Sequence, residues 1–353
     1  MKIDFPSHTF YPSTRSLSNS KDLPLFSIII TTYNRATYLA ETIESALKQS
    51  YSNIEIIIVD HKALELNKEI YSKFISENDN ISLVKFNENH GVYKVISYCW
   101  NAGLKYSKGE FVAVLNDDDY VSNNYVEKMV NLFLENPKCI TAAPQPVSVD
   151  QGLKIETELI SIRNRFLSGF ELAKSIISGN GNNLISAPGG IMCFRKNSLL
   201  ETGGFDIISD WSQIFKHSVL GDTGYDSEAK LYWRHHAEQS NRVMQDKGDI
   251  FYNTIMNGIK GSQLIEFWKK NFSINDALML ENYLRTCVEG DVVGVLQRQL
   301  RRRKFVSVPR ILYNTYLECP HLLPKQIVVM FKFVPWAVRE LIQKLFLKLL
   351  GKS

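Results

Sequence analysis

Three adjacent carboxylates, Asp117, Asp118 and Asp119, directly follow an apolar run at residues 111–115 and Asn116. Neighbouring carboxylates repel one another, so such a cluster costs stability unless it is solvated or holds a cation. Hard oxygen ligands suit Mg²⁺ or Mn²⁺, which also bridge phosphate oxygens. The alternative is a solvated, aspartate-rich turn. The position behind a buried strand favours a metal site with these three carboxylates as ligands.

Other polar side chains follow further predicted strands. Apolar and β-branched runs predict strands at residues 26–31, 54–59, 81–86 and 111–115. Helical spacing lies between them at residues 38–49 and 92–106. Alternating strands and helices predict an α/β fold with a parallel sheet covered on both faces. Ligands bind beyond the carboxyl ends of such strands, where Thr32, Tyr33, Asn34 and Asp60 would join the acidic triplet.

The pattern divides the chain into three parts. Residues 1–24 form a polar tail, residues 25–255 an α/β domain, and residues 256–353 a helical, basic extension. Within the α/β domain, the second half is less regular, and strands are predicted at residues 189–194 and 231–234. The boundary between the two halves is placed at residues 138 and 139.

Several motifs occur together in one order. SIIITTYNRATYLAETIESALKQ, IEIIIVD, NHGV and NAGLKYSKGEFVAVLNDDD resemble the nucleotide-sugar half of family 2 glycosyltransferases with the GT-A fold. GGIMCFRKNSLLETGGFD, Asp210-Trp211 and YWRHH resemble the acceptor half, and the resemblance spans about residues 25–242. It implies a Rossmann-like, mostly parallel sheet flanked by helices. It also implies inverting transfer of a sugar from a nucleotide-sugar donor, most readily a UDP-sugar.

The resemblance assigns donor-side roles to individual residues. Thr32 and Asp60 match positions that contact the nucleoside, with Tyr33 and Asn34 beside them. The run Asp117, Asp118 and Asp119 matches the DxD-type motif that holds metal and diphosphate. Departures from the family pattern are Thr31, His61 with Lys62, and Asn116. Thr32 and Asp60 could instead serve as caps of the segments that follow them.

On the acceptor side, the resemblance makes Asp210 the general base, and Asp206 and Asp222 are nearby competitors. His235 matches a position close to the diphosphate or metal, although it and His236 could be packed or solvated. Trp211 could stack on an acceptor sugar or fill the core. A carboxylate base takes the proton of the acceptor hydroxyl, and a dication stabilises the departing diphosphate, so direct displacement would invert the anomeric carbon.

The C-terminal sixty residues are strongly basic, with twelve Lys and Arg against two Glu, while the rest of the chain is mildly acidic. A dense group lies at residues 298–304, and residues 336–352 have one apolar and one basic helical face. Such a helix suits an anionic membrane surface. The alternatives are docking on the catalytic domain or on a second subunit in a homo-oligomer. Nucleic acid is disfavoured because aromatic residues are sparse around the arginines.

These observations predict a metal-dependent transferase that acts on a glycan or lipid-linked acceptor in surface polysaccharide synthesis. Five scattered cysteines without a CxxC pair favour a reducing compartment, which together with the basic tail predicts a cytoplasmic, peripheral position at the inner membrane face. A sugar-1-phosphate nucleotidyltransferase is the first alternative, but a Gly-rich phosphate loop is missing after the first strand. A non-catalytic nucleotide-sugar-binding scaffold is the second.

Overall fold

The computed structural model describes residues 7–17, 23–33, 35–61, 64–87, 92–150, 157–158, 165–178, 192–205, 210–236, 239, 252–261, 263–302 and 305–333. The chain forms two compact units. The first contains Met1–His236 and Ser262–Ala277, and the second contains Ala237–Gly261 and Leu278–Ser353. The candidate site lies in the first unit.

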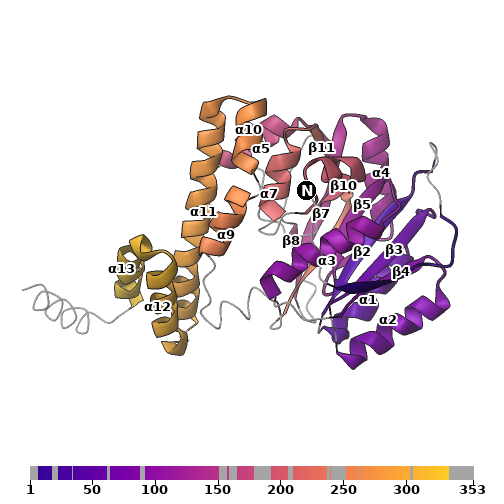
Figure 1. Cartoon of the computed structure of the whole chain (residues 1–353), viewed down its shortest axis with the longest axis horizontal. Coiled ribbons are helices and arrows are strands. Elements are labelled where there is room, and N and C mark those ends of the chain that lie inside the picture. Colours follow the sequence, from indigo (N-terminus) through magenta and orange to yellow (C-terminus); the bar gives the residue numbers. More distant parts are fainter. Residues whose placement is uncertain are drawn as a thin grey trace, which may run out of the picture. The chain divides into compact units, whose positions relative to one another are not determined.

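A mixed sheet forms the centre of the first unit (Figure 1). In the described residues its strand order is β1-β4-β3-β2-β5-β10-β7-β11-β6, with β8 paired to β7 and β9 to β11. The strands are β1 (His8–Tyr11), β2 (Phe26–Thr32), β3 (Ile54–Asp60), β4 (Ile81–Phe86), β5 (Phe111–Asn116), β6 (Tyr120–Val121), β7 (Cys139–Asp150), β8 (Thr157–Glu158), β9 (Phe166–Leu167), β10 (Cys193–Arg195) and β11 (Asp222–His235). The parallel strands β2, β3, β4 and β5 confirm the four predicted runs.

The first unit also contains helices, several of which cover the two faces of this sheet. They are α1 (Ala36–Leu47), α2 (Glu65–Glu77), α3 (Val92–Tyr106), α4 (Tyr125–Glu135), α5 (Gly169–Ile177), α6 (Lys196–Glu201), α7 (Asp210–His217) and α10 (Leu264–Asn271). The apolar faces of α1, α2 and α4 share a core with Ile28 and Ile30, whereas α3 packs against Ile29 on the opposite face. Gly103 permits that approach, because a Cβ there would lie 2.4 Å from Ile29 Cγ2.

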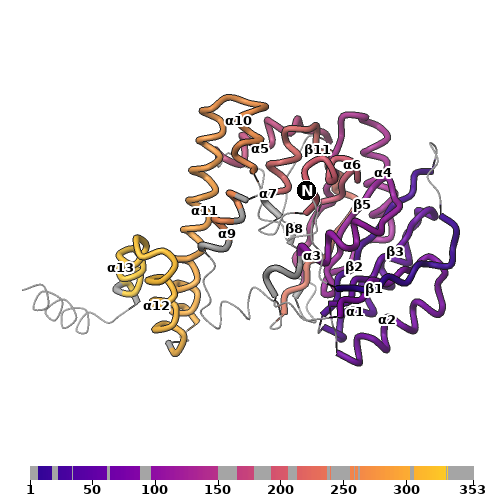
Figure 2. Tube along the Cα trace, viewed as in Figure 1, coloured from indigo at the N-terminus to yellow at the C-terminus, as the bar shows by residue number. Residues whose placement is uncertain are grey.

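An edge strand lies within the segment predicted to be a polar tail. This strand, β1, is labelled in Figure 2. It pairs antiparallel with β4, and Phe10 stacks on Tyr106 with 4.0 Å between ring centroids. The sequence of β1 is short and its side chains alternate between half-buried and exposed, so it lacks the apolar run that marks the central strands. The tail therefore contributes a strand to the sheet, while the remaining domain limits stay predictions.

The register of the parallel strands brings their polar ends together. Thr32 is paired with Asp60, and Thr31 with Asn116. The residues that follow β2, β3 and β5 therefore lie along one edge of the sheet, as the alternating pattern predicted. The segment after β5 is the acidic triplet.

The second unit is helical and confirms the predicted C-terminal extension. Its elements are α9 (Tyr252–Gly261), most of α11 (Ile274–Arg301), η2 (Phe305–Ser307), α12 (Val308–Glu318), η3 (Pro320–Leu322) and α13 (Leu323–Phe333). Leu296, Ile311 and Leu322 lie at the centre of its apolar core. The predicted helix at residues 336–352 lies outside the described residues, so its membrane role stays a prediction.

None of the described helices combines the length and apolarity required to cross a bilayer. The five cysteines are free thiols.

His217 near the end of α7 is buried in its neutral form. Its Nδ1 donates to the Gln213 carbonyl at 2.8 Å, and its Nε2 has no hydrogen-bond partner among the described residues. Burial lowers the pKa of His217 to about 4. Because the unfolded chain binds the proton at higher pH than the folded chain, this group stabilises the fold less as pH falls from about 6.5 to 4.

Between pH 8 and pH 4, we expect the free energy of unfolding of His217→Gln to fall by about 3 kcal/mol less than that of the wild type. Urea unfolding of both proteins at several pH values measures it. The quantity to compare is the slope of the free energy of unfolding against pH, because the substitution also changes packing, and that effect is the same at every pH. Equal slopes for the two proteins would contradict a neutral, buried His217.

Candidate active site

The acidic triplet forms a buried turn between β5 and β6. Asp117, Asp118 and Asp119 are 0%, 5% and 2% exposed. Thr42 on α1 donates to the Asp119 carbonyl at 2.8 Å and ties the turn to the neighbouring helix. Burying three carboxylates side by side requires compensating charge and hydrogen bonds, and the surrounding elements supply both.

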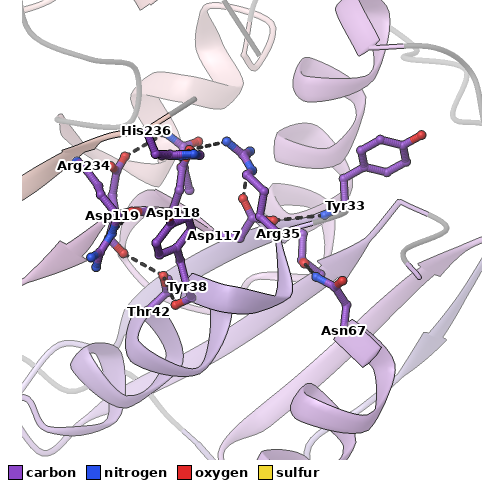
Figure 3. A network of polar contacts seen from close by, with 12 residues as sticks. Tyr33, Arg35, Tyr38, Thr42, Asn67, Asp117, Asp118, Asp119, Arg234 and His236 are labelled. Atoms are coloured by element: carbon purple, nitrogen blue, oxygen red, sulfur yellow. Dashed lines mark hydrogen bonds and ion pairs between the residues drawn. The ribbon is translucent and has the colours of Figure 1, made fainter. Parts of the chain in front are cut away.

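Arg35 bridges two of these carboxylates (Figure 3). Its Nη2 lies 2.8 Å from Asp117 Oδ1, and its Nη1 pairs with Asp118 Oδ2. Asp117 also accepts from the Tyr33 backbone N–H at 3.1 Å and from the Thr32 hydroxyl. The turn between β2 and α1 is thus fastened to the turn after β5 by one side chain and one backbone amide.

The carboxylates of this turn have strongly altered acidities. Burial raises the pKa of Asp117 to about 6, although the charge of Arg35 opposes the shift. Burial and the charge of Asp118 raise the pKa of Asp119 well above its usual range. Hydrogen bonds from Arg234 and Asn116 oppose that second shift. Burial thus disfavours the charged forms of Asp117 and Asp119, and a cation bound beside them would favour those forms.

Arg234 near the end of β11 braces the same turn. Its backbone N–H donates to Asp119 Oδ1 at 3.1 Å and its Nε donates to the Asp118 carbonyl at 3.0 Å. Its guanidinium lies over the rings of Tyr38 and Tyr120, at 4.7 and 5.1 Å from their centroids. Both oxygens of Asp119, predicted as a metal ligand, accept hydrogen bonds from the protein: one from this Arg234 amide and the other from Asn116 Nδ2 at 3.2 Å.

His236 occupies the position that the sequence assigned to His235. His236 Nε2 lies 3.0 Å from Asp118 Oδ2, while the His235 ring packs on Trp233 at 4.2 Å between centroids. Successive residues at a strand end point to opposite sides, so Arg234 and His236 share the side that faces the acidic turn. His236 Nδ1 is buried without a hydrogen-bond partner among the described residues.

The predicted nucleoside residues lie at the adjoining strand ends. Thr32 is buried and accepts a hydrogen bond from Asn67 Nδ2 at 3.0 Å. Asp60 is buried and accepts one from the Tyr71 hydroxyl at 2.8 Å. The Tyr33 ring lies beside the ring of His61, with 5.5 Å between centroids. Asn34 lies outside the described residues.

The acceptor-side candidates are only partly described. Asp210 and Trp211 begin α7, but their side chains are outside the described part of the chain, as is Asp206. Asp222 accepts from Asn136 Nδ2 at 3.0 Å at the start of β11, the opposite end of that 14-residue strand from the acidic turn. Its position does not suit a base acting beside Asp118.

The donor atoms fit a dication that shares its coordination with phosphate oxygens. Across the described ranges, no group of three or more His, Cys, Asp or Glu side chains is arranged to hold a metal ion alone. Mg²⁺ sites commonly use one or two carboxylates and complete the coordination with water and substrate phosphates. Asp118, with Asp117 on one side and His236 on the other, provides such a partial set.

Comparison with known proteins decides the family. The model of glycosyl transferase family 2 matches residues 27–199. An uncharacterized glycosyltransferase of Rickettsia prowazekii is 38% identical over 223 residues, which are 62% of this chain and 66% of that protein. The chain belongs to family 2 of the glycosyltransferases.

A more distant relative is a teichoic acid biosynthesis protein. The minor teichoic acid biosynthesis protein GgaB of Bacillus subtilis is 30% identical over 145 residues, 40% of this chain and 15% of GgaB. The chain spans about half the length, or less, of several curated relatives that it matches.

Solved structures confirm the GT-A fold of this family 2 member. Residues 1–349 of S. aureus TarS in complex with UDP-GlcNAc align over 88% of this chain and 80% of that chain, with a TM-score of 0.56 and 16% identity. The mannosyltransferase PcManGT of Pyrobaculum calidifontis, in complex with GDP-Man and Mn²⁺, covers 90% of this chain and 88% of its own, with a TM-score of 0.52 and 14% identity.

Arg35, Arg234 and His236 are the site residues that sequence reasoning missed. Each lies within or beside a motif that the resemblance used, TTYNR or YWRHH. Their positive charge could have indicated Arg35 and Arg234, because a buried acidic triplet requires cations from elsewhere in the chain.

We expect Arg234→Lys to lower the free energy of unfolding by about 2 kcal/mol, because Lys retains the charge but loses the planar stacking and the Nε contact. Urea unfolding measures the change. Arg165→Lys is the matched control, since Arg165 pairs with Glu135 and Asp226 at a more exposed position. That control should cost less than about 1 kcal/mol, and equal losses would show that Arg234 has no special bracing role.

Proposed function

We propose that this family 2 enzyme is an inverting glycosyltransferase that moves a sugar from a nucleoside-diphosphate sugar to a hydroxyl of a surface glycan or lipid-linked acceptor. The observation that carries the proposal is the buried pair Asp117 and Asp118 at the carboxyl edge of the parallel sheet, beside His236. The nucleotide sugars in the TarS and PcManGT structures and the teichoic acid role of GgaB support the substrate class.

Asp118, Asp117 and His236 would hold Mn²⁺ or Mg²⁺ on the acidic turn. When bound, the dication supplies electrostatic stabilisation of the charge that develops on the departing diphosphate. Asp119 and Arg234 fix the turn, so that Asp118 keeps its orientation. This arrangement is preorganised, because the supporting hydrogen bonds are already formed in the protein.

The adjoining strand ends suit the nucleoside. The partly exposed Tyr33 ring lies beside the buried His61 ring, and Thr32, the residue before Tyr33, donates to Asp117. Asp60 is held by Tyr71, whose pKa is raised by burial and by this hydrogen bond, so the phenol remains a donor. We infer that this region orients the base and ribose of the donor, with a UDP-sugar as the expected ligand.

Asp210 is the proposed general base. It begins α7, and α7 is fixed in the first unit by the Gln213 side chain, which donates to the Gly204 carbonyl at 3.0 Å. Gly203 and Gly204 adopt positive φ values of 89° and 85°, which shape the turn that precedes α7. A base that acts from the side opposite the leaving group takes the proton of the attacking hydroxyl and gives inversion.

We expect Asp118→Asn to reduce Mn²⁺-dependent release of nucleoside diphosphate at least 100-fold, because the carboxylate between Asp117 and His236 loses its charge. A panel of UDP- and GDP-sugars, assayed for released UDP or GDP, measures the effect. Asp222→Asn, at the far end of β11, is the matched control and should retain activity. Retained activity in Asp118→Asn would remove the basis of the proposed function.

We expect Asp210→Asn to leave donor affinity within about threefold of the wild-type value while transfer to the acceptor falls at least 100-fold. Thermal shift with nucleotide sugar and Mn²⁺ reports donor binding, because a ligand that binds the folded state raises its apparent stability. Parallel loss of donor binding and transfer would assign Asp210 a structural role instead.

A further inference from the structure

The two arginines at the acidic turn are held in different ways. Arg234 donates to Glu41 Oε2 at 2.6 Å and to the Asp118 carbonyl, and its guanidinium lies over two aromatic rings. The polar contacts of the Arg35 guanidinium, within the described part of the chain, are the carboxylates of Asp117 and Asp118 (Figure 3). Arg234 therefore has neutral as well as charged partners, whereas the described side-chain partners of Arg35 are the two carboxylates.

Arg35 uses the oxygens that a dication would need. Asp118 Oδ2 faces both Arg35 Nη1 and His236 Nε2, and Asp117 Oδ1 faces Arg35 Nη2. The other oxygen of Asp117 accepts the Tyr33 backbone amide. A guanidinium and a dication compete for the same carboxylate oxygens, because their positive charges repel at such separations.

The position of Arg35 allows it to leave. Its side chain is 21% exposed, against 0% for Asp117 and 7% for Asp118, so it covers carboxylates that lie beneath it. Arg35 is the residue that caps the start of α1, and its long side chain can turn without moving β2 or α1. A guanidinium also binds phosphate oxygens through the same two-pronged contact that it makes with carboxylates.

We propose that Arg35 is a place-holding cation: it neutralises Asp117 and Asp118 in the free enzyme and opposes binding of a dication that arrives without nucleotide. A nucleoside diphosphate offers the guanidinium new anionic partners and frees the carboxylate oxygens. Metal and donor then bind cooperatively, and Arg35 contacts the diphosphate in the loaded site. This inference rests on the proposed function for its ligand, and Arg35 acts as a positioning residue.

The test is a Mn²⁺ titration of the full chain, followed by the EPR signal of the free ion, in the absence of nucleotide. We expect Arg35→Gln to bind Mn²⁺ at least tenfold more tightly than the wild type, because the competing charge is removed while the carboxylates remain. Arg35→Lys keeps a charge but loses the two-pronged contact, and its affinity should be intermediate. A purely structural role for Arg35 predicts unchanged or weaker Mn²⁺ binding in both variants.

Arg165→Gln is the matched control. Arg165 also bridges two carboxylates, Glu135 and Asp226, but next to β9 and away from the acidic turn, so its loss should leave Mn²⁺ binding unchanged. Thermal unfolding verifies that each variant is folded. If Arg35→Gln does not fold, Arg35→Lys replaces it in the test. Mn²⁺ affinity in a folded Arg35 variant that does not exceed the wild-type value overturns the proposal.

A second titration with saturating UDP or GDP measures the coupling. In the wild type, nucleotide also removes the competing Arg35 charge, so it should increase Mn²⁺ affinity at least tenfold more than in Arg35→Gln. Equal increases in the two proteins contradict release of Arg35 by nucleotide. If neither nucleotide binds either protein, the proposed function fails, and the titration without nucleotide still tests Arg35 by itself.

Discussion

The need to bury three consecutive carboxylates at the end of a strand governs the architecture around the site. An isolated buried carboxylate is strongly disfavoured, so each of these groups must find a cation or several hydrogen-bond donors. Asp117 finds Arg35 and the Tyr33 amide, and Asp119 finds the Arg234 amide and Asn116. These partners come from before α1, from the end of β5 and from the end of β11. The turn is thus the point where both halves of the GT-A unit meet.

The strand order brings the partners of these carboxylates to the turn. β5 lies between the parallel strand β2 and the antiparallel strand β10, so its carboxyl end is fixed on one side by the first half of the unit. The short strand β6, directly after the triplet, pairs with β11, and this pairing places the end of β11 beside the acidic turn. Arg234 and His236 reach the turn through this pairing. A helix or loop in place of β6 would not hold them at a fixed register.

The elements that sequence predicted are those whose signal is local. Apolar runs before Thr32, Asp60 and Asn116 were sufficient to place three parallel strands and their common edge. Arg35 and His236 were not assigned, because their contacts with Asp118 join residues 83 and 118 positions apart, and nothing local distinguishes them. His235 and His236 are neighbours of the same type. Which of them faces the turn depends on how the side chains alternate along β11. β1 was missed because an edge strand needs little apolar sequence.

The contrast between Arg234 and Arg35 follows from what the acidic turn must do in two states. A turn designed only for stability would be neutralised by two fixed arginines, since buried charge is costly when its partner can leave. A turn designed only for ligand binding would leave its carboxylates uncompensated in the free protein, at a cost to folding. One fixed and one detachable arginine satisfies both demands. The fixed arginine preserves the geometry, and the detachable one neutralises charge until a ligand with its own charges replaces it.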